Sequence, residues 1–380
     1  MRIFLAIPRS PNPTFVSDLW TRNLFDPLVA LGHDVILFDE GLLPLFDLDP
    51  AATATAAPRD AFAARLSRAV EAADRAGRLD LILTYVGDSH LTPDVIRRLR
   101  ERVAPVVNFF CNNVHQFHLI RRTAPHFTAC LVPEQEALQS YRRVGANEIF
   151  FPMAANPEVY RPVPVSLRYE ASFAGQRYGD RTTAMLALRE GGVDAHAFGQ
   201  GWTAEGQASG GAPQGRLRRS LQLLLHGRNL MTAAADLRAI ETLRARHAAT
   251  LHPPATDDGY ISLFSESRIS LGFLILGDTH RTFRPLRQVR LREFEAPMAG
   301  AFYMTGFLEE LSLHYEIGRE IVCYRSREEL VDRCRYFLAH DEERERIRMA
   351  GYERARRDHT WARRFTDLFE ELRRRGVLSR

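Results

Sequence analysis

The chain has 380 residues, more than the roughly 250–300 at which a single hydrophobic core stops growing, so two domains are expected. Its 51 basic and 47 acidic side chains give a net charge of +4 at pH 7. These charges are spread along the chain, which argues against the one-sided basic face of a nucleic-acid-binding protein. All 51 basic residues are arginine. Without lysine, Schiff-base chemistry and a P-loop are excluded, and arginine or backbone N–H groups must bind any phosphate.

The cysteines and the apolar segments place further limits on the class of protein. The four cysteines show neither C-x-x-C pairing nor metal-ligand spacing, which favours free thiols and argues against a structural zinc site. No stretch approaches the roughly 20 apolar residues of a membrane span, and the first residues lack the pattern of a signal peptide. We therefore expect a cytoplasmic protein.

Short apolar runs alternate with helical patterns in the first 151 residues. Thr92–Arg102 and Pro133–Val144 have helical spacing, and the second begins with the proline and acidic residues typical of helix N-termini. Strands alternating with helices predict a parallel sheet with helices on both faces. The predicted strands are Arg2–Pro8, Asp34–Phe38, Leu79–Tyr85, Pro105–Phe110, Phe127–Val132 and Glu148–Phe151.

Prolines crowd residues 152–166, which indicates a linker between two domains. A second α/β series follows, and the chain is almost wholly helical from Ser326 onward. The pattern predicts an N-terminal domain over residues 1–160, a C-terminal domain over 161–355, and a final helix over 356–380. The elements expected in the second series are strands Tyr169–Ala174, Val193–Phe198, Arg268–Phe273, Ala301–Thr305 and Glu320–Tyr324 and helices Arg181–Glu190 and Arg292–Ala299.

Residues 203–250 interrupt this rhythm as an insertion. A glycine-rich start leads into 216–246, where seven arginines outnumber Asp236 and Glu241 and leucines recur at helical spacing. Such a segment could touch a membrane surface or an acidic partner. A helical insertion that packs its leucines on its own domain is the simpler interpretation.

Candidate ligand-binding residues follow two of the predicted elements in the second series. Gly175, Arg177 and Arg181 lie between a strand and a helix, where a glycine turn and a helix N-terminus suit a diphosphate. Arg290, Arg292 and Glu295 lie at the start of a later helix, where arginines could bind phosphates and a carboxylate could accept ribose hydroxyls. A glycine turn without ligand and a set of helix salt bridges are the structural alternatives.

Several separated motifs resemble the C-terminal domain of CgeB-like glycosyltransferases. They are Ser172-Phe-Ala-Gly-Gln-Arg-Tyr-Gly-Asp-Arg181, Gly199-Gln-Gly-Trp202, Gln288–Tyr303, Thr305-Gly-Phe-Leu-Glu-Glu310, Gly318-Arg-Glu-Ile-Val-Cys-Tyr324 and Asp358-His-Thr-Trp361.

This resemblance implies a GT-B fold, in which two doubly wound Rossmann-like domains face a cleft and a C-terminal crossover helix joins them. It also implies a nucleotide-sugar donor in the second domain, with Gly199 and Trp202 in the donor site and Glu295 on the donor ribose. Eight residues before Glu295 the chain has Arg287 instead of the first glutamate of the E-x7-E pattern. The stereochemical outcome of transfer therefore stays open.

The acceptor would then bind the first domain, where His115 and Asp88 are the candidates for a general base. Both could instead cap helices or line the site. No metal or cofactor is expected, because arginines and helix N-termini could stabilise the departing diphosphate.

The sequence predicts a glycosyltransferase that uses a glycan, polysaccharide or protein acceptor. A nucleotide-sugar epimerase of the same plan and a non-catalytic glycan- or nucleotide-binding partner are the alternatives.

Overall fold

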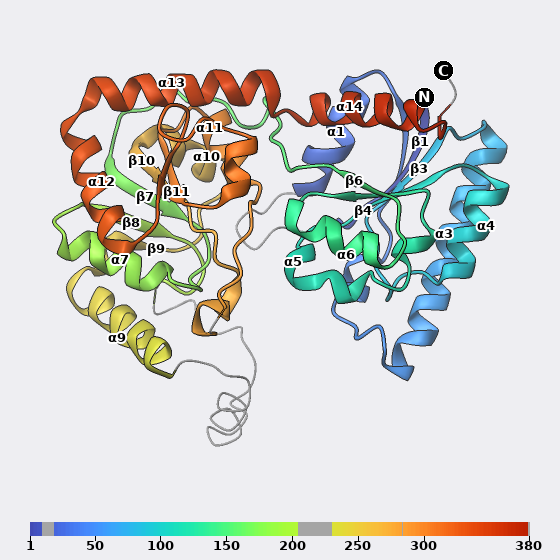
Figure 1. Cartoon of the computed structure of the whole chain (residues 1–380), viewed down its shortest axis with the longest axis horizontal. Helices are drawn as coiled ribbons and strands as arrows, with labels where there is room; N and C mark the ends of the chain where they lie inside the picture. The colour runs from blue at the N-terminus through green and yellow to red at the C-terminus, as the bar shows by residue number, and fades with distance from the viewer. Residues whose placement is uncertain (10–18, 204–229, 283, 379–380) are drawn as a thin grey trace. The chain divides into compact units, whose positions relative to one another are not determined.

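The computed structural model describes residues 1–9, 19–203, 230–282 and 284–378, and these form two compact units. The described part of the first unit comprises 1–9, 19–156 and 360–378. That of the second comprises 157–203, 230–282 and 284–359. Each unit is built on its own sheet (Figure 1).

The sheet of the first unit has six parallel strands in the order β2-β1-β3-β4-β5-β6. Ile3 pairs with Val35 on one side and with Leu81 on the other, so β1 lies inside the sheet and the strand order reverses beside it. Such a reversal places right-handed crossover helices on both faces of the sheet. The strands are β1 (Arg2–Ala6), β2 (Asp34–Phe38), β3 (Leu81–Thr84), β4 (Val106–Phe109), β5 (Ala129–Val132) and β6 (Glu148–Phe150).

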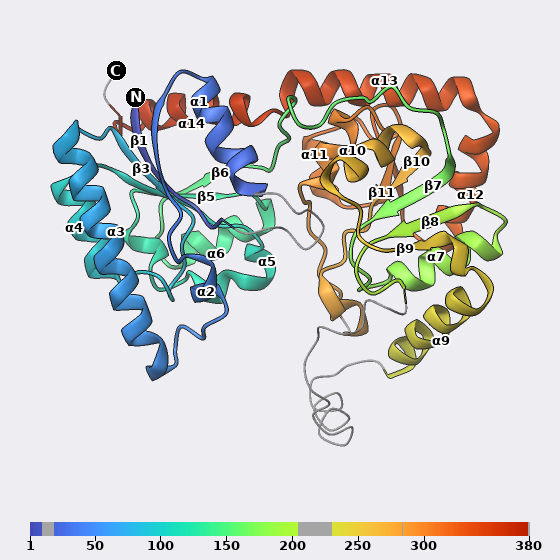
Figure 2. The same ribbon diagram turned by 180° about the vertical axis from the view of Figure 1, so that it is seen from behind.

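Helices of the first unit flank this sheet, as Figure 2 shows from behind. They are α1 (Asp26–Ala30), α2 (Leu43–Phe46), α3 (Ala56–Ala76), α4 (Pro93–Arg102), α5 (Asn113–Gln116), α6 (Leu138–Arg143) and α14 (Trp361–Arg374).

The last helix, α14, packs on the first unit although the second unit precedes it in the chain. Its apolar side is buried, and Trp361 lies with its ring centroid 6.0 Å from that of Phe151 and 6.4 Å from that of Phe109. The Thr360 hydroxyl caps the helix by accepting a hydrogen bond from the Arg363 N–H at 3.1 Å.

The sheet of the second unit also has six parallel strands, in the order β9-β8-β7-β10-β11-β12. Numbered within the unit this is 3-2-1-4-5-6, the order of the Rossmann fold, and its switch point lies between β7 and β10. Ligands of such sheets bind at the carboxyl ends of the strands near that point. The strands are β7 (Tyr169–Ala174), β8 (Ala195–Phe198), β9 (Leu251–His252), β10 (Ser267–Leu271), β11 (Tyr303–Gly306) and β12 (Val322–Tyr324).

The helices of the second unit include α9, which lies in the insertion and packs against α7. Its Arg244 donates hydrogen bonds to the carbonyls of Gly201, Trp202 and Thr203. Residues 204–229, including most of the predicted leucine pattern, lie outside the described residues. The helices are α7 (Arg181–Glu190), α9 (Leu230–Arg246), α10 (Asp257–Glu266), α11 (Arg292–Met298), α12 (Arg327–Ala339) and α13 (Asp341–Asp358), with the short 3-10 helix η8 (Gly277–Arg281).

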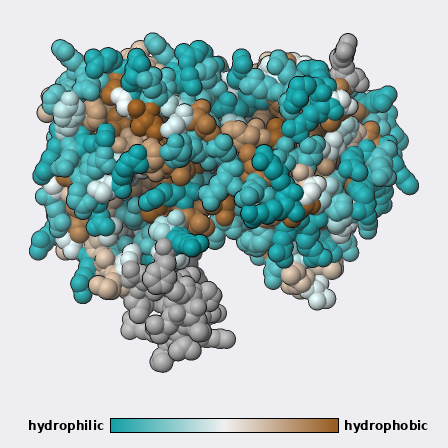
Figure 3. Space-filling view, viewed as in Figure 1, coloured by the Kyte–Doolittle hydropathy of each residue, from teal (hydrophilic) through white to brown (hydrophobic). Residues whose placement is uncertain are grey.

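The face drawn in Figure 3 is mainly hydrophilic, with apolar side chains scattered among polar ones, as on ordinary globular proteins. Among the described helices, none combines the length and apolarity that a membrane-spanning segment requires.

Candidate functional site

The turns that follow β7 and β8 contact each other at the carboxyl edge of the second sheet. The buried Trp202 indole donates a hydrogen bond to the Gly175 carbonyl at 2.8 Å. Gly199 has a φ of +147°, and a Cβ there would lie only 2.3 Å from the Gly175 carbonyl oxygen. Gly199 and Trp202, predicted in the donor site, therefore shape the turn that presents the residues after Gly175.

Arg177 joins the same pair of turns. Its N–H donates to the Gln200 carbonyl and its Nε donates to the Gly201 carbonyl, both at 2.9 Å. The side chain is half-buried.

Beyond this turn, three arginines that we call the arginine cluster, Arg181, Arg290 and Arg292, converge on the switch point. Arg181 and Arg290 both donate to the Tyr178 hydroxyl, and the Arg181 guanidinium lies 3.6 Å from the centre of the Tyr178 ring. Arg290 also donates to the Ile275 carbonyl at 2.9 Å. These contacts hold the turn after β7 against the segment that precedes α11.

The third member of the cluster, Arg292, is hydrogen-bonded to Tyr260 of α10. Its Nε donates to the Tyr260 hydroxyl at 3.3 Å, and that hydroxyl donates to Glu295 at 3.4 Å. A Cβ at Gly175 would lie 3.1 Å from Arg292 Nη2, so the guanidinium rests against the glycine turn. Glu295 is only 3% exposed, and this geometry favours a role in positioning Arg292.

Glu293 fixes the backbone at Arg290. Its carboxylate accepts hydrogen bonds from the Arg290 N–H and from the Tyr303 hydroxyl, both at 2.7 Å. Sequence reasoning did not single out Glu293, Tyr178 or Tyr260.

Positive charge prevails in this region. Burial raises the pKa of Glu293, and it raises the pKa of Glu295 to about 7 despite hydrogen bonding from Tyr160 and the charge of Arg292. Burial also lowers the pKa of Arg181, which is 2% exposed. Burial opposes ionisation of Tyr178, yet Arg181 and Arg290 bring its pKa below its ordinary value. Glu295, beside Arg292, is thus partly protonated near neutral pH and neutralises the arginine cluster only in part, an arrangement that attracts anions.

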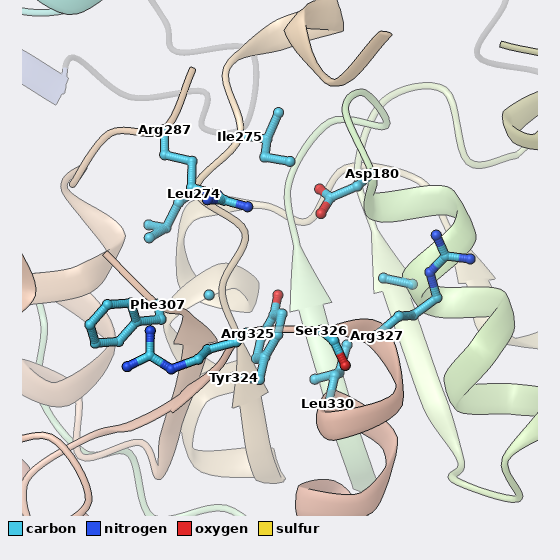
Figure 4. A pocket seen from close by; sticks show the side chains of 12 residues that line it. Asp180, Leu274, Ile275, Arg287, Phe307, Tyr324, Arg325, Ser326, Arg327 and Leu330 are labelled. Carbon is cyan, nitrogen blue, oxygen red and sulfur yellow. The ribbon is translucent and has the colours of Figure 1, made fainter. Parts of the chain in front are cut away.

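A pocket of about 240 Å³ adjoins the arginine cluster at the carboxyl ends of β10, β11 and β12. We call it the strand-end pocket (Figure 4). It is lined by Asp180, Ala184, Leu274, Ile275, Arg287, Gly306, Phe307, Tyr324, Arg325, Ser326, Arg327 and Leu330.

In the first unit, Asp88 follows β3 and is 4% exposed. Its carboxylate accepts hydrogen bonds from the Thr123 N–H at 2.9 Å, the Thr123 hydroxyl at 2.7 Å and the Arg122 N–H at 3.1 Å. A buried carboxylate with three donors anchors a loop, so this geometry favours a structural role for Asp88.

His115 is exposed on α5, beyond the carboxyl end of β4. The turn before it is fixed by the buried Glu134, which accepts hydrogen bonds from the N–H groups of Asn112 and Asn113. Asn112 has a φ of +63°, in the left-handed region that asparagine tolerates. His115 therefore stands on an ordered turn with its imidazole open to solvent.

The described residues contain no group of three or more His, Cys, Asp or Glu side chains arranged to hold a metal ion.

Comparison with solved structures decides the fold. A sucrose-phosphate synthase from Thermosynechococcus elongatus aligns over 98% of both chains with a TM-score of 0.60 and 14% identity. The Anabaena protein HepE in complex with UDP aligns over 98% of this chain and 99% of its own, with a TM-score of 0.56 and 11% identity. The chain has the GT-B fold.

A glycosyltransferase from Rickettsia africae shares this GT-B architecture, with a TM-score of 0.61, 9% identity and 98% of both chains covered. The family described as glycosyl transferase-like matches residues 182–370, which include the arginine cluster except for Arg181. No protein with a curated description has a sequence that matches this one. The fold prediction is confirmed, whereas the finer resemblance to CgeB-like enzymes stays a prediction.

Proposed function

We propose that this GT-B chain is a glycosyltransferase that moves a sugar from a nucleoside-diphosphate-sugar donor to a hydroxyl of a glycan, polysaccharide or protein. The observation that carries the proposal is the arginine cluster at the switch point of the second sheet. It offers guanidinium donors and an excess of positive charge where Rossmann-like sheets bind nucleotides. The complexes of HepE with UDP and with UDP-glucose lend support.

In this proposal the cluster binds the diphosphate and stabilises the negative charge that develops on it as the glycosidic bond breaks. No metal is assigned to that task. His115 is the proposed base for the acceptor hydroxyl, because its imidazole is exposed whereas the Asp88 carboxylate is committed to hydrogen bonds.

The test is binding of UDP, GDP, ADP and dTDP, measured by calorimetry for the purified chain and for Arg290→Gln. One nucleoside diphosphate should bind, and Arg290→Gln should weaken it by about 10- to 100-fold, since a hydrogen bond to a charged group contributes about 1.5–3 kcal/mol. Arg319→Gln is the matched control, because Arg319 is exposed and pairs with Glu316. Equal affinities for wild type and Arg290→Gln would reject the assignment.

Product analysis without acceptor separates the alternatives. Slow hydrolysis of the donor supports a transferase, an isomerised sugar supports an epimerase, and an unchanged donor on a chain that binds it supports a non-catalytic binding role.

A further inference from the structure

The charges that line the strand-end pocket do not balance. Arg287 lies in the segment before α11, Arg325 follows β12, and Arg327 is the first residue of α12. Asp180 is the single carboxylate among the lining residues. Within the described part of the chain, none of the three arginines makes an ion pair within 4 Å. The pocket therefore has a net positive charge even when Asp180 is ionised.

Asp180 supplies the pocket with a hydrogen-bond acceptor. Its Oδ1 is buried and has no hydrogen-bond partner among the described residues, and burial raises the pKa of this carboxyl although Arg181, His280 and Arg287 oppose the rise. In Figure 4 the Arg287 side chain extends toward Asp180. An acceptor beside several arginines suits a ligand that carries both hydroxyl groups and an acidic group.

The pocket shares a wall with the arginine cluster. Ile275 lines it and also accepts a hydrogen bond from Arg290 through its carbonyl, and Asp180 directly precedes Arg181. At about 240 Å³ the pocket is smaller than the roughly 300–1,000 Å³ of a site for a whole drug-sized ligand. It has room for one ring of a ligand whose diphosphate lies on the cluster.

From this juxtaposition we propose that the strand-end pocket selects a donor whose sugar carries a carboxylate, that is, a nucleoside-diphosphate-linked uronic acid. The proposal rests on the proposed function. The Arg287 fork binds the carboxylate, Arg325, whose guanidinium lies 3.5 Å from the centre of the Phe307 ring, adds positive charge, and Asp180 accepts hydrogen bonds from sugar hydroxyls. A neutral hexose has no anionic group for the arginines to bind. A phosphate in place of the sugar has no hydroxyl groups that could donate hydrogen bonds to Asp180.

The test compares donors that differ only in the oxidation state of the sugar C6. Calorimetry measures the affinities of UDP-glucose and UDP-glucuronate, and of GDP-mannose and GDP-mannuronate, for the purified chain. In the pair whose nucleobase the protein binds, the uronate donor should bind at least tenfold more tightly than the hexose donor. This ratio corresponds to a difference of about 1.4 kcal/mol in binding free energy. Equal binding, or tighter binding of the hexose, overturns the proposal.

Variants locate the selectivity. Arg287→Gln should reduce the uronate-to-hexose ratio to about twofold or less while the affinity for the nucleoside diphosphate alone stays within about twofold. Arg319→Gln should keep the full ratio. A ratio that survives in Arg287→Gln and in the Arg287→Gln, Arg325→Gln double variant overturns the assignment to this pocket.

The same measurements distinguish this inference from the proposed function. If nucleoside diphosphates bind without a preference for the uronate, only the inference fails. If none binds, the proposed function fails and the inference falls with it.

Discussion

Replacing Glu295 by glutamine should change how the stability of the second unit depends on pH. Burial is the main cause that raises the pKa of this carboxyl from 4.5 to about 7. Because the folded pKa lies above the unfolded one, Glu295 stabilises the fold fully below about pH 4.5 and loses that contribution as the pH rises through about 7. At 1.36 kcal/mol per pH unit, this loss is about 3 kcal/mol.

Glutamine has nearly the same shape and no charge, so the Glu295→Gln variant lacks this loss. Its free energy of unfolding relative to wild type should therefore rise by about 3 kcal/mol between roughly pH 5 and pH 8. Hydrogen exchange of backbone amides in β10 and β11 follows the second unit alone, and comparison at equal pH cancels the intrinsic exchange rates.

The matched control is Glu309→Gln, because Glu309 is exposed in the same unit. Its difference from wild type gives the reference against which the difference for Glu295→Gln is compared at each pH. A difference for Glu295→Gln that is constant with pH, or that falls as the pH rises, would refute the assignment of Glu295 as a buried carboxyl with a raised pKa.

Two further outcomes follow from the site. Gly199→Ala should destabilise the second unit by about 2 kcal/mol or more in the same exchange measurement, because its Cβ meets the Gly175 carbonyl at 2.3 Å. Gly192→Ala, which has φ +80° but no atom within 4 Å of its Cβ, should cost only about 1 kcal/mol. Nucleoside diphosphate affinity and turnover should be unchanged by EDTA if, as proposed, the arginine cluster alone binds the diphosphate. Activity lost in EDTA and restored by Mg²⁺ would contradict this proposal.

The regular elements could be predicted where apolar runs are long and glycine or proline marks their ends. Tyr169–Ala174 and Arg181–Glu190 have the predicted bounds because the strand ends in a glycine turn that leads directly into the helix. Several elements were missed, among them strand β9 and helices α3 and α10. Strand β9 has only two residues, too few for a periodic pattern. Helix α3 is rich in alanine, which gives little contrast between its buried and exposed sides.

The site could be predicted only where its members are neighbours in the sequence. Arg290 and Arg292 flank the start of one helix, so their spacing drew attention to them. Tyr260 is 32 residues from Arg292, and nothing in the local pattern links the two. The strand-end pocket takes Arg287 from the segment before α11 and Arg325 and Arg327 from the connection between β12 and α12, and only the order of the strands brings these two segments together. Arg325, directly after β12, and Arg327, at the start of α12, were the available signal.

The absence of lysine shapes the chemistry of the cluster. Arg181 and Arg290 each donate hydrogen bonds to the Tyr178 hydroxyl and to a backbone carbonyl. These bonds fix the planes of both guanidinium groups. The Nε atoms of both are buried without a hydrogen-bond partner among the described residues. Arg181 is 2% exposed, whereas Arg290 is only partly buried. An anion that reaches the exposed part of Arg290 therefore meets a stronger attraction than it would in water. A flexible ammonium would keep its hydration shell, so the rigid forks are the better receptor for a diphosphate.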